Sequence, residues 1–263
     1  MEITMKEVFD LMISGIPGAP YSETVDTLKT GDPNRKVTGI VVTFLASYEV
    51  IQQAIASGAN LIITHEPTFY NHLDNIDWLK DDAVYQAKRK LIEENQLTIW
   101  RFHDYLHSLQ PDPTLVGLLK RLGWTNYAQP DMPFVCQMPP RKLSEFVSEI
   151  KAKLGLSTVR VVGDMQMTCQ RVGILVGACP GDMQIRIMSD QSLDLLIAGE
   201  INEWETSEYV RDSSAMGKPT ALIVTGHSIS EEDGMLEIVP WLQARFPEIP
   251  VTHIPTGHAL VTI

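Results

Sequence analysis

The sequence predicts an α/β protein built from two related α/β halves. Short apolar runs alternate with segments of helical length, a pattern that is typical of βαβ units and parallel sheets. Several of the apolar runs end in polar residues, and the second half of the chain repeats the arrangement of the first. The 263 residues suffice for one large domain or two small ones.

In the first half, residues 37–44, 61–64 and 97–102 are apolar and rich in β-branched side chains, which predicts three strands. Three helices are expected between and after them. Ser47 is a suitable N-cap and Gly58 a suitable end for a helix over 47–56. Residues 77–95 and 113–122 have the amphipathic spacing of two more.

The segment 129–133 contains two prolines and interrupts the pattern, so we place the domain boundary there, with halves 1–128 and 129–263. Beyond it, helices are predicted near 144–154, 202–212 and 235–246. Strands are predicted at 159–163, 171–177, 195–200, 221–225 and 251–254. The similarity between the halves is one of architecture, because short apolar runs carry no more than that. A site to which both contribute is expected in the cleft between them.

Composition narrows the class of protein. A net charge of −12 argues against a nucleic-acid-coating surface, which needs clustered Lys and Arg. No apolar stretch approaches the ~20 residues that span a bilayer, and the first residues do not resemble a secretory signal. Cys136, Cys169 and Cys179 lack metal-site or disulfide spacing, so we expect neutral thiols in a cytoplasmic protein.

The first candidate ligands follow the predicted strand 61–64. His65 and Glu66 stand at its end, and Pro67 stops the strand. Open α/β sheets bind ligands at the carboxyl ends of their strands, which favours a metal site here. An equally weighted alternative is a polar pair that only solvates a loop.

Two further histidines follow the predicted strand 97–102. His103 and His107 are four residues apart, so a helical turn would place both rings on one face. Imidazole is the commonest side-chain ligand of mid-row metals. The alternative is the exposed start of a helix, with Asp104 as its capping residue.

The third group follows the predicted strand 221–225. His227 and Glu231 are four residues apart, whereas Glu232 and Asp233 fit the acidic start of a helix. His72, in a polar loop, is expected to be exposed. His253 and His258 are expected to be structural. Glu200, Glu203 and Glu205 crowd the turn between a strand and a helix and are expected to form a solvated helix face, with Glu200 the only one placed to reach a pocket.

The order and context of these segments resemble the Nif-three-like dinuclear metal-centre proteins, a family described as GTP cyclohydrolase homologues. The segments that carry the resemblance are ASGANLIITHEPTFY, RFHDYLH, LSEFVSEIKAKLGLSTVRVVGD, DLLIAGEINEWE and GHSISEEDGM, and they extend over nearly the whole chain. The resemblance implies two related α/β halves with two metals between them. It also implies a homo-oligomer, specifically a hexamer.

Two positions depart from the family pattern. The family shows two adjacent histidines where this chain has His65 and Glu66, and a histidine followed four residues later by aspartate where it has His103 and His107. One imidazole has become a carboxylate and one carboxylate an imidazole. Because the ligand types are conserved in number, we expect a rearranged site that still works.

The resemblance therefore implies that His65, Glu66, His107, His227 and Glu231 bind two divalent metal ions, with Glu231 as the bridge. Iron, zinc, manganese or nickel would suit these nitrogen and oxygen ligands. His103 is expected to support a ligand or transfer a proton. The implied activity is metal-dependent hydrolysis of a small nucleotide-like substrate, similar to GTP cyclohydrolase. The alternatives are a non-catalytic metal-binding hexameric assembly or adaptor protein, and a relative that has lost one or both metals.

Overall fold

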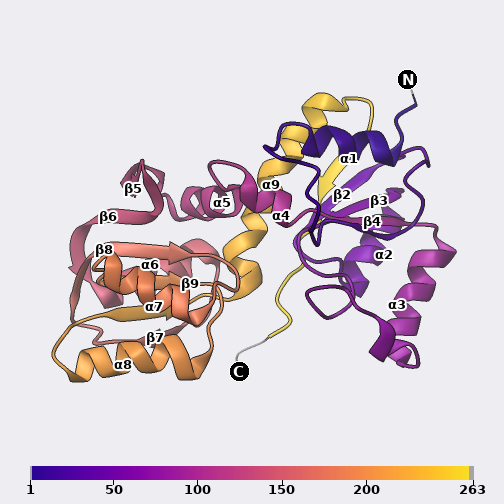
Figure 1. Cartoon of the computed structure of the whole chain (residues 1–263). Helices are drawn as coiled ribbons and strands as arrows, with labels where there is room; N and C mark the ends of the chain where they lie inside the picture. Colours follow the sequence, from indigo (N-terminus) through magenta and orange to yellow (C-terminus); the bar gives the residue numbers. More distant parts are fainter. Residues whose placement is uncertain (1, 261–263) are drawn as a thin grey trace. The chain divides into compact units, whose positions relative to one another are not determined.

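The computed structural model describes residues 2–260, which form two compact units. The first unit comprises Met1–Pro113 and Met235–Thr256, and the second comprises Thr114–Gly234 and Gly257–Ile263. The predicted boundary at 128/129 therefore differs from the division observed. Residues 114–128 pack with the second unit, and residues 235–256 return to the first (Figure 1).

The first unit contains a five-stranded sheet in the order β1-β4-β3-β2-β11. The strands are β1 (Leu28–Thr30), β2 (Ile40–Thr43), β3 (Leu61–Thr64), β4 (Thr98–Arg101) and β11 (Val251–His253). Strands β11, β2, β3 and β4 are parallel, and β1 is antiparallel at the edge. Thr64 is in register with Arg101, so β3 and β4 end together and the residues that follow them share one edge of the sheet.

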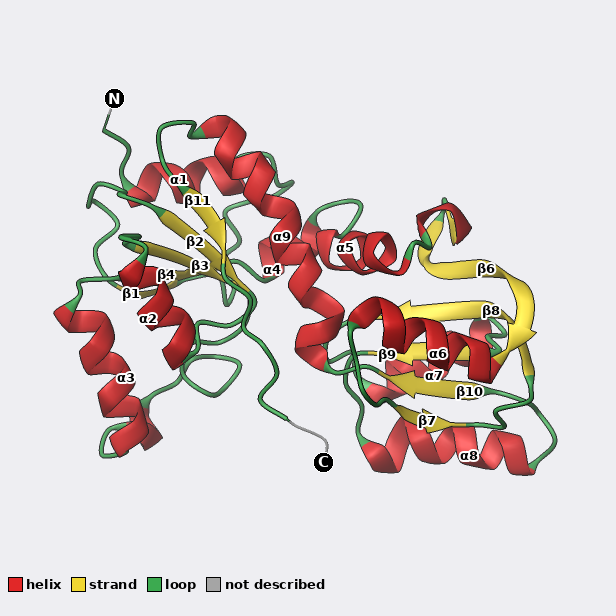
Figure 2. Ribbon diagram, turned by 180° about the vertical axis from the view of Figure 1, so that it is seen from behind, coloured by secondary structure: helices red, strands yellow, loops and turns green. Residues whose placement is uncertain are grey.

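Helices cover both faces of this sheet (Figure 2). They are α1 (Met5–Ile13), α2 (Tyr48–Ala56), the 3₁₀ turn η1 (Asp77–Leu79), α3 (Ala83–Glu94), α4 (Asp104–Ser108) and the last part of α9 (His227–Arg245). Side chains alternate along each strand. Ile63 on β3 therefore packs with α1 and α9, while the adjacent Ile62 packs with α2 and α3.

The second unit contains a six-stranded sheet in the order β5-β6-β8-β9-β10-β7. The strands are β5 (Ala128–Gln129), β6 (Met132–Lys142), β7 (Arg160–Val162), β8 (Thr168–Leu175), β9 (Leu195–Ala198) and β10 (Ala221–Val224). Strands β8, β9 and β10 are parallel, and the outer strands are antiparallel.

Besides the start of α9, the second unit contains four helices, a 3₁₀ turn and a π-helical turn. They are α5 (Pro113–Leu122), the 3₁₀ turn η2 (Thr125–Tyr127), α6 (Leu143–Leu154), α7 (Gly181–Asp190), the π-helical turn η3 (Glu203–Ser207) and α8 (Glu208–Ala215). The residues of α5 and α6 share a core with Ile197 of β9, whereas those of α7 and α8 pack with Leu196 and Ala198. Each unit is thus a sheet between two helical layers, and the predicted α/β class is confirmed.

Local rules explain most element boundaries. The Ser47 side chain accepts a hydrogen bond from the Val50 backbone N–H and caps α2, as predicted. The predicted helix 77–95 is shorter, because the Asp82 carboxylate accepts from the N–H groups of Val84 and Tyr85 and starts α3 there. The proline-rich segment 128–142 forms the β5–β6 hairpin, which was not predicted.

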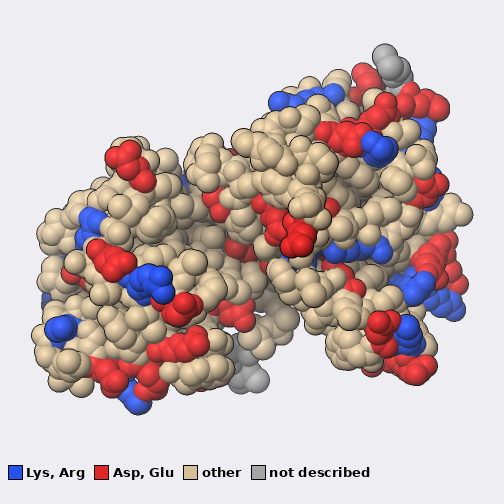
Figure 3. Space-filling model, viewed as in Figure 1, with Lys and Arg blue, Asp and Glu red and all other residues tan. Residues whose placement is uncertain are grey.

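The surface is acidic overall. On the face shown in Figure 3, basic side chains are scattered among acidic ones and do not merge into one basic surface. Over residues 2–260, no helix combines the length and the apolar character that crossing a bilayer requires.

Candidate metal centre

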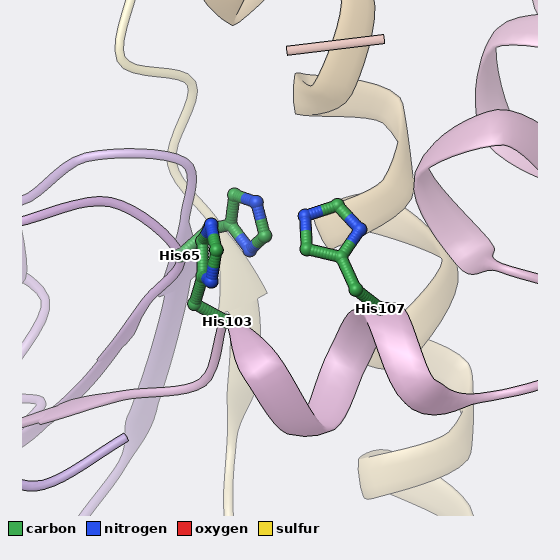
Figure 4. Close-up of side chains that lie close together, drawn as sticks. All are labelled: His65, His103 and His107. Carbon is green, nitrogen blue, oxygen red and sulfur yellow. The ribbon is translucent and has the colours of Figure 1, made fainter. Parts of the chain in front are cut away.

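Three histidines meet at the carboxyl edge of the first sheet (Figure 4). His65 follows β3 and is fully buried, while His103 and His107 are four residues apart at helix α4, after β4. The His65 ring centroid is 4.7 Å from that of His103 and 4.9 Å from that of His107, and the latter two are 4.8 Å apart. One nitrogen from each ring lies within 4.8 Å of the other two, a spacing that could hold a metal ion.

Helix α4 is only five residues long and is stabilised by a residue far away in the sequence. Asp26, in the segment before β1, accepts backbone hydrogen bonds from His103 at 2.7 Å, Asp104 at 3.0 Å and Tyr105 at 2.8 Å. Burial raises the pKa of the Asp26 carboxyl, and the three N–H donors partly oppose that shift. The Asp26 carboxylate therefore caps the start of α4, where the N-cap residue is His103 itself, and holds both histidines in place.

The Nδ1 atom of each ring contacts an oxygen of the same unit. The distances are 3.2 Å from His65 to the Phe102 carbonyl, 2.9 Å from His103 to Asp104, and 2.8 Å from His107 to Asp112. A carbonyl or carboxylate can only accept, so Nδ1 carries the proton and Nε2 is the nitrogen that would coordinate. The three rings are thus oriented as metal-binding histidines usually are.

Glu66 lies beside this cluster and pairs with a buried cation. Its Oε2 is 3.4 Å from Arg101, and its Oε1 is 3.8 Å from Nε2 of His103. Arg101 is fully buried, and its Nε donates to the His65 carbonyl at 3.0 Å. One guanidinium therefore holds the backbone of His65 and balances the charge of Glu66.

His103 is electrically neutral near pH 7. Burial lowers its pKa to about 4, and the neighbouring His65 and His107 contribute in the same direction. Its hydrogen bond to Asp104 opposes the shift without reversing it. A neutral imidazole retains a lone pair that can bind a metal or accept a proton.

The second unit places His227 and Glu231 on the first turns of α9. Nε2 of His227 is 3.0 Å from Oε2 of Glu231, and its Nδ1 is 2.9 Å from Oε2 of Glu200. Glu231 is buried against Gly177, whose φ is +62° and where a Cβ atom would overlap the carboxylate. His227 therefore presents its Nε2 atom directly beside the carboxylate of Glu231.

The other candidates have structural or surface environments. His72 and His258 are exposed, and His253 lies half-buried on β11. Asp233 pairs with Arg121 at 3.2 Å. Cys136 and Cys169 are buried, which raises the pKa values of their thiols to about 11 and about 12.

A cavity of about 530 Å³ opens near β1 and α3 in the first unit, and none of the six predicted site residues lines it. Sequence reasoning missed Asp26, Arg101 and Asp112, which hold the candidate ligands. Asp26 is separated from the residues it caps by 77 to 79 positions, and no local pattern marks it.

Buried histidine and carboxylate groups on two α/β units define a protein that could bind metal ions. The chain belongs to the Duf34/NIF3 (NGG1p interacting factor 3) family, whose model matches residues 16–258. The family resemblance of the sequence is thereby confirmed.

The chain is similar to three proteins that are distant from it in sequence. The chain is 24% identical over 230 residues to the GTP cyclohydrolase 1 type 2 homolog of Clostridium perfringens, covering 83% of this chain and 82% of that protein. Protein ybgI, of unknown function, superposes with a TM-score of 0.78 at 21% identity, over 98% of this chain and 100% of that one. The hypothetical protein SA1388 of Staphylococcus aureus gives a TM-score of 0.76 at 19% identity, covering 100% of both chains. These structures support the fold.

Proposed function

We propose that the chain binds two divalent metal ions and is a metal-dependent hydrolase that acts on a small nucleotide-like substrate. The observation that carries the proposal is the cluster of His65, His103 and His107, in which every Nδ1 is held by an oxygen. Three imidazoles that pack this closely in a partly buried site repel one another if they are protonated. Coordination of a cation by the neutral rings of His65 and His107, with the neutral ring of His103 beside them, explains the arrangement.

In this proposal His65, Glu66, His107, His227 and Glu231 would hold the ions. The bound ions would lower the pKa of a water molecule and polarise the group under attack. Glu66 is restrained by Arg101 and can offer Oε1 to an ion. His103 is held at Nδ1 by Asp104, so its Nε2 is the atom that would accept a proton during hydrolysis.

The nucleotide-like substrate is supported by the name of the Clostridium perfringens relative, a GTP cyclohydrolase 1 type 2 homolog. We also propose that the chain forms a hexamer. Closed assemblies of this kind need interfaces of at least ~1,000 Å², usually with an apolar centre. Light scattering that gave a monomer at micromolar concentration would contradict this part.

The decisive experiment is metal analysis of protein purified without chelator, followed by turnover of GTP and related nucleotides. We expect two metal ions per chain, and loss of at least one in His65→Ala and in His227→Ala. His258→Ala is the matched control, because His258 is exposed. If both ligand variants retain the full metal content, the site is wrong. Two bound metals without turnover of any nucleotide would refute the hydrolase and favour a metal-binding assembly.

A further inference from the structure

The imidazole of His227 lies between two carboxylates of different character. Glu231 faces Nε2, is almost completely buried, and is itself a candidate ligand. Glu200 follows β9, is 57% exposed at its side chain, and faces Nδ1 at 2.9 Å. A histidine that binds metal through one nitrogen usually donates its other N–H to such a carboxylate.

We propose that Glu200 is a positioning residue for metal binding by His227. It accepts the Nδ1–H, which fixes the ring orientation and keeps Nε2 beside Glu231. The inference rests on the proposed function only in taking His227 as a ligand. Glu200 itself does not need to touch the metal or the substrate.

The backbone of Glu200 is held much more firmly than its exposure suggests. Its N–H donates to the Gly177 carbonyl at 2.9 Å. Its carbonyl accepts from the Gln184 amide at 2.9 Å, and Gln184 is fully buried. The same amide donates to the Cys179 carbonyl at 2.8 Å, and its oxygen accepts from Thr206 at 2.6 Å. Gln184 thus ties together the segments after β8 and β9 and the turn η3.

This clamp explains why a solvent-exposed carboxylate can orient a ring. An ordinary exposed ion pair contributes little to stability, because two mobile side chains must be ordered to form it. In this case one partner starts from a fixed peptide and the other from the first turn of α9, so less entropy is lost when they meet.

Neighbouring carboxylates of the same turn have other partners. Glu203 pairs with Arg160 at 2.8 Å on the surface. Glu205 accepts from the Asn202 amide at 2.9 Å. Glu200 differs from both in contacting a histidine, His227, which makes Glu203 a matched control for it.

The test measures Zn²⁺ affinity of the full chain by competition with a chromophoric chelator. We expect Glu200→Gln to weaken binding about 10- to 100-fold. The Zn²⁺ affinity of Glu203→Gln should stay within about twofold of that of the parent protein, since exposed ion pairs contribute little to stability. The Co²⁺-loaded protein gives a second readout. Its visible absorption should change in Glu200→Gln and not in Glu203→Gln.

Three results would separate the possibilities. If His227→Ala leaves Zn²⁺ affinity unchanged, His227 is not a ligand, and the proposed function fails at this position together with the inference. If His227→Ala weakens binding while Glu200→Gln does not, Glu200 has no positioning role and only the inference falls. The inference is also overturned if Glu200→Gln lowers the melting temperature of the metal-free protein by more than about 4 °C, because the role is then structural.

Discussion

The carboxylate of Asp26 offers the sharpest test of how the histidine cluster is held. We predict that Asp26→Ala destabilises the metal-free protein and also weakens metal binding. The side chain accepts three backbone hydrogen bonds at the start of α4, from His103, Asp104 and Tyr105. Because α4 has five residues, it has little helical stability of its own.

The magnitude follows from what the substitution removes. Loss of an N-cap costs about 0.5–2 kcal/mol. The N–H of Tyr105, a buried residue, would in addition lose its acceptor, at a cost of about 1–3 kcal/mol. The raised pKa of Asp26 shows that burying the carboxylate costs free energy, which Ala recovers. We therefore expect a net loss of about 2–4 kcal/mol.

Asp26→Asn should cost less, about 1–2 kcal/mol, because one acceptor oxygen remains while the amide group faces an N–H donor. The assay is urea unfolding of metal-free protein, followed by far-UV circular dichroism, together with Zn²⁺ affinity. Asp10→Ala is the control, since Asp10 pairs with Lys6 on the exposed side of α1, and should change stability by less than about 0.5 kcal/mol. If Asp26→Ala costs no more than Asp10→Ala, the capping argument is wrong.

Three other outcomes are expected. Gly177→Ala should weaken Zn²⁺ binding at least about tenfold, because a Cβ at this position would overlap Glu231. Gly217 also has a positive φ, +75°, but has open space around it, so Gly217→Ala is the control. It should lower the free energy of unfolding in urea by about 1–2 kcal/mol through backbone strain alone. Lys88 has a pKa lowered to about 8 by burial, so the unfolded chain binds more protons between about pH 8 and 10.5, and stability should rise with pH in that window. Urea unfolding should show a rise of about 2 kcal/mol from pH 7 to 9.5 that is missing in Lys88→Met; an equal rise in both proteins would assign it elsewhere. Glu66→Gln should lower the free energy of unfolding by about 3–5 kcal/mol, because it leaves Arg101 buried without its counter-charge. In a double-mutant cycle, adding Arg101→Met should recover part of that loss. Additive losses would show that Glu66 and Arg101 are not coupled.

Local patterns in the sequence were sufficient for most of the parallel strands and the capped helices. Residues 61–64 and 113–122 were predicted with the bounds that β3 and α5 have. The prolines of segment 129–133 suggested a domain boundary, and the β5–β6 hairpin was not predicted. In the structure, Pro139 and Pro140 fall where the β6–β8 register shifts, and an irregularity of that kind tolerates residues without an N–H. Helix α1 was missed, although its Thr4–Glu7 capping box is local.

The exchange of ligand types at positions 66 and 107 shows where sequence reasoning reaches its limit. The family resemblance suggested that Glu66 and His107 compensate for each other, since the numbers of imidazoles and carboxylates are the same as in the family pattern. The structure gives each its own partner: Arg101 for Glu66 at 3.4 Å and Asp112 for His107 at 2.8 Å. Arg101 is 35 residues from Glu66 in sequence, and its role is apparent only from the pairing of β3 with β4. A buried charge must be balanced by an opposite charge nearby, so the effect of a substitution at position 66 or 107 depends first on the partner of that residue. Restoring the histidine at position 66 would leave the Arg101 charge unbalanced, whatever residue stands at 107.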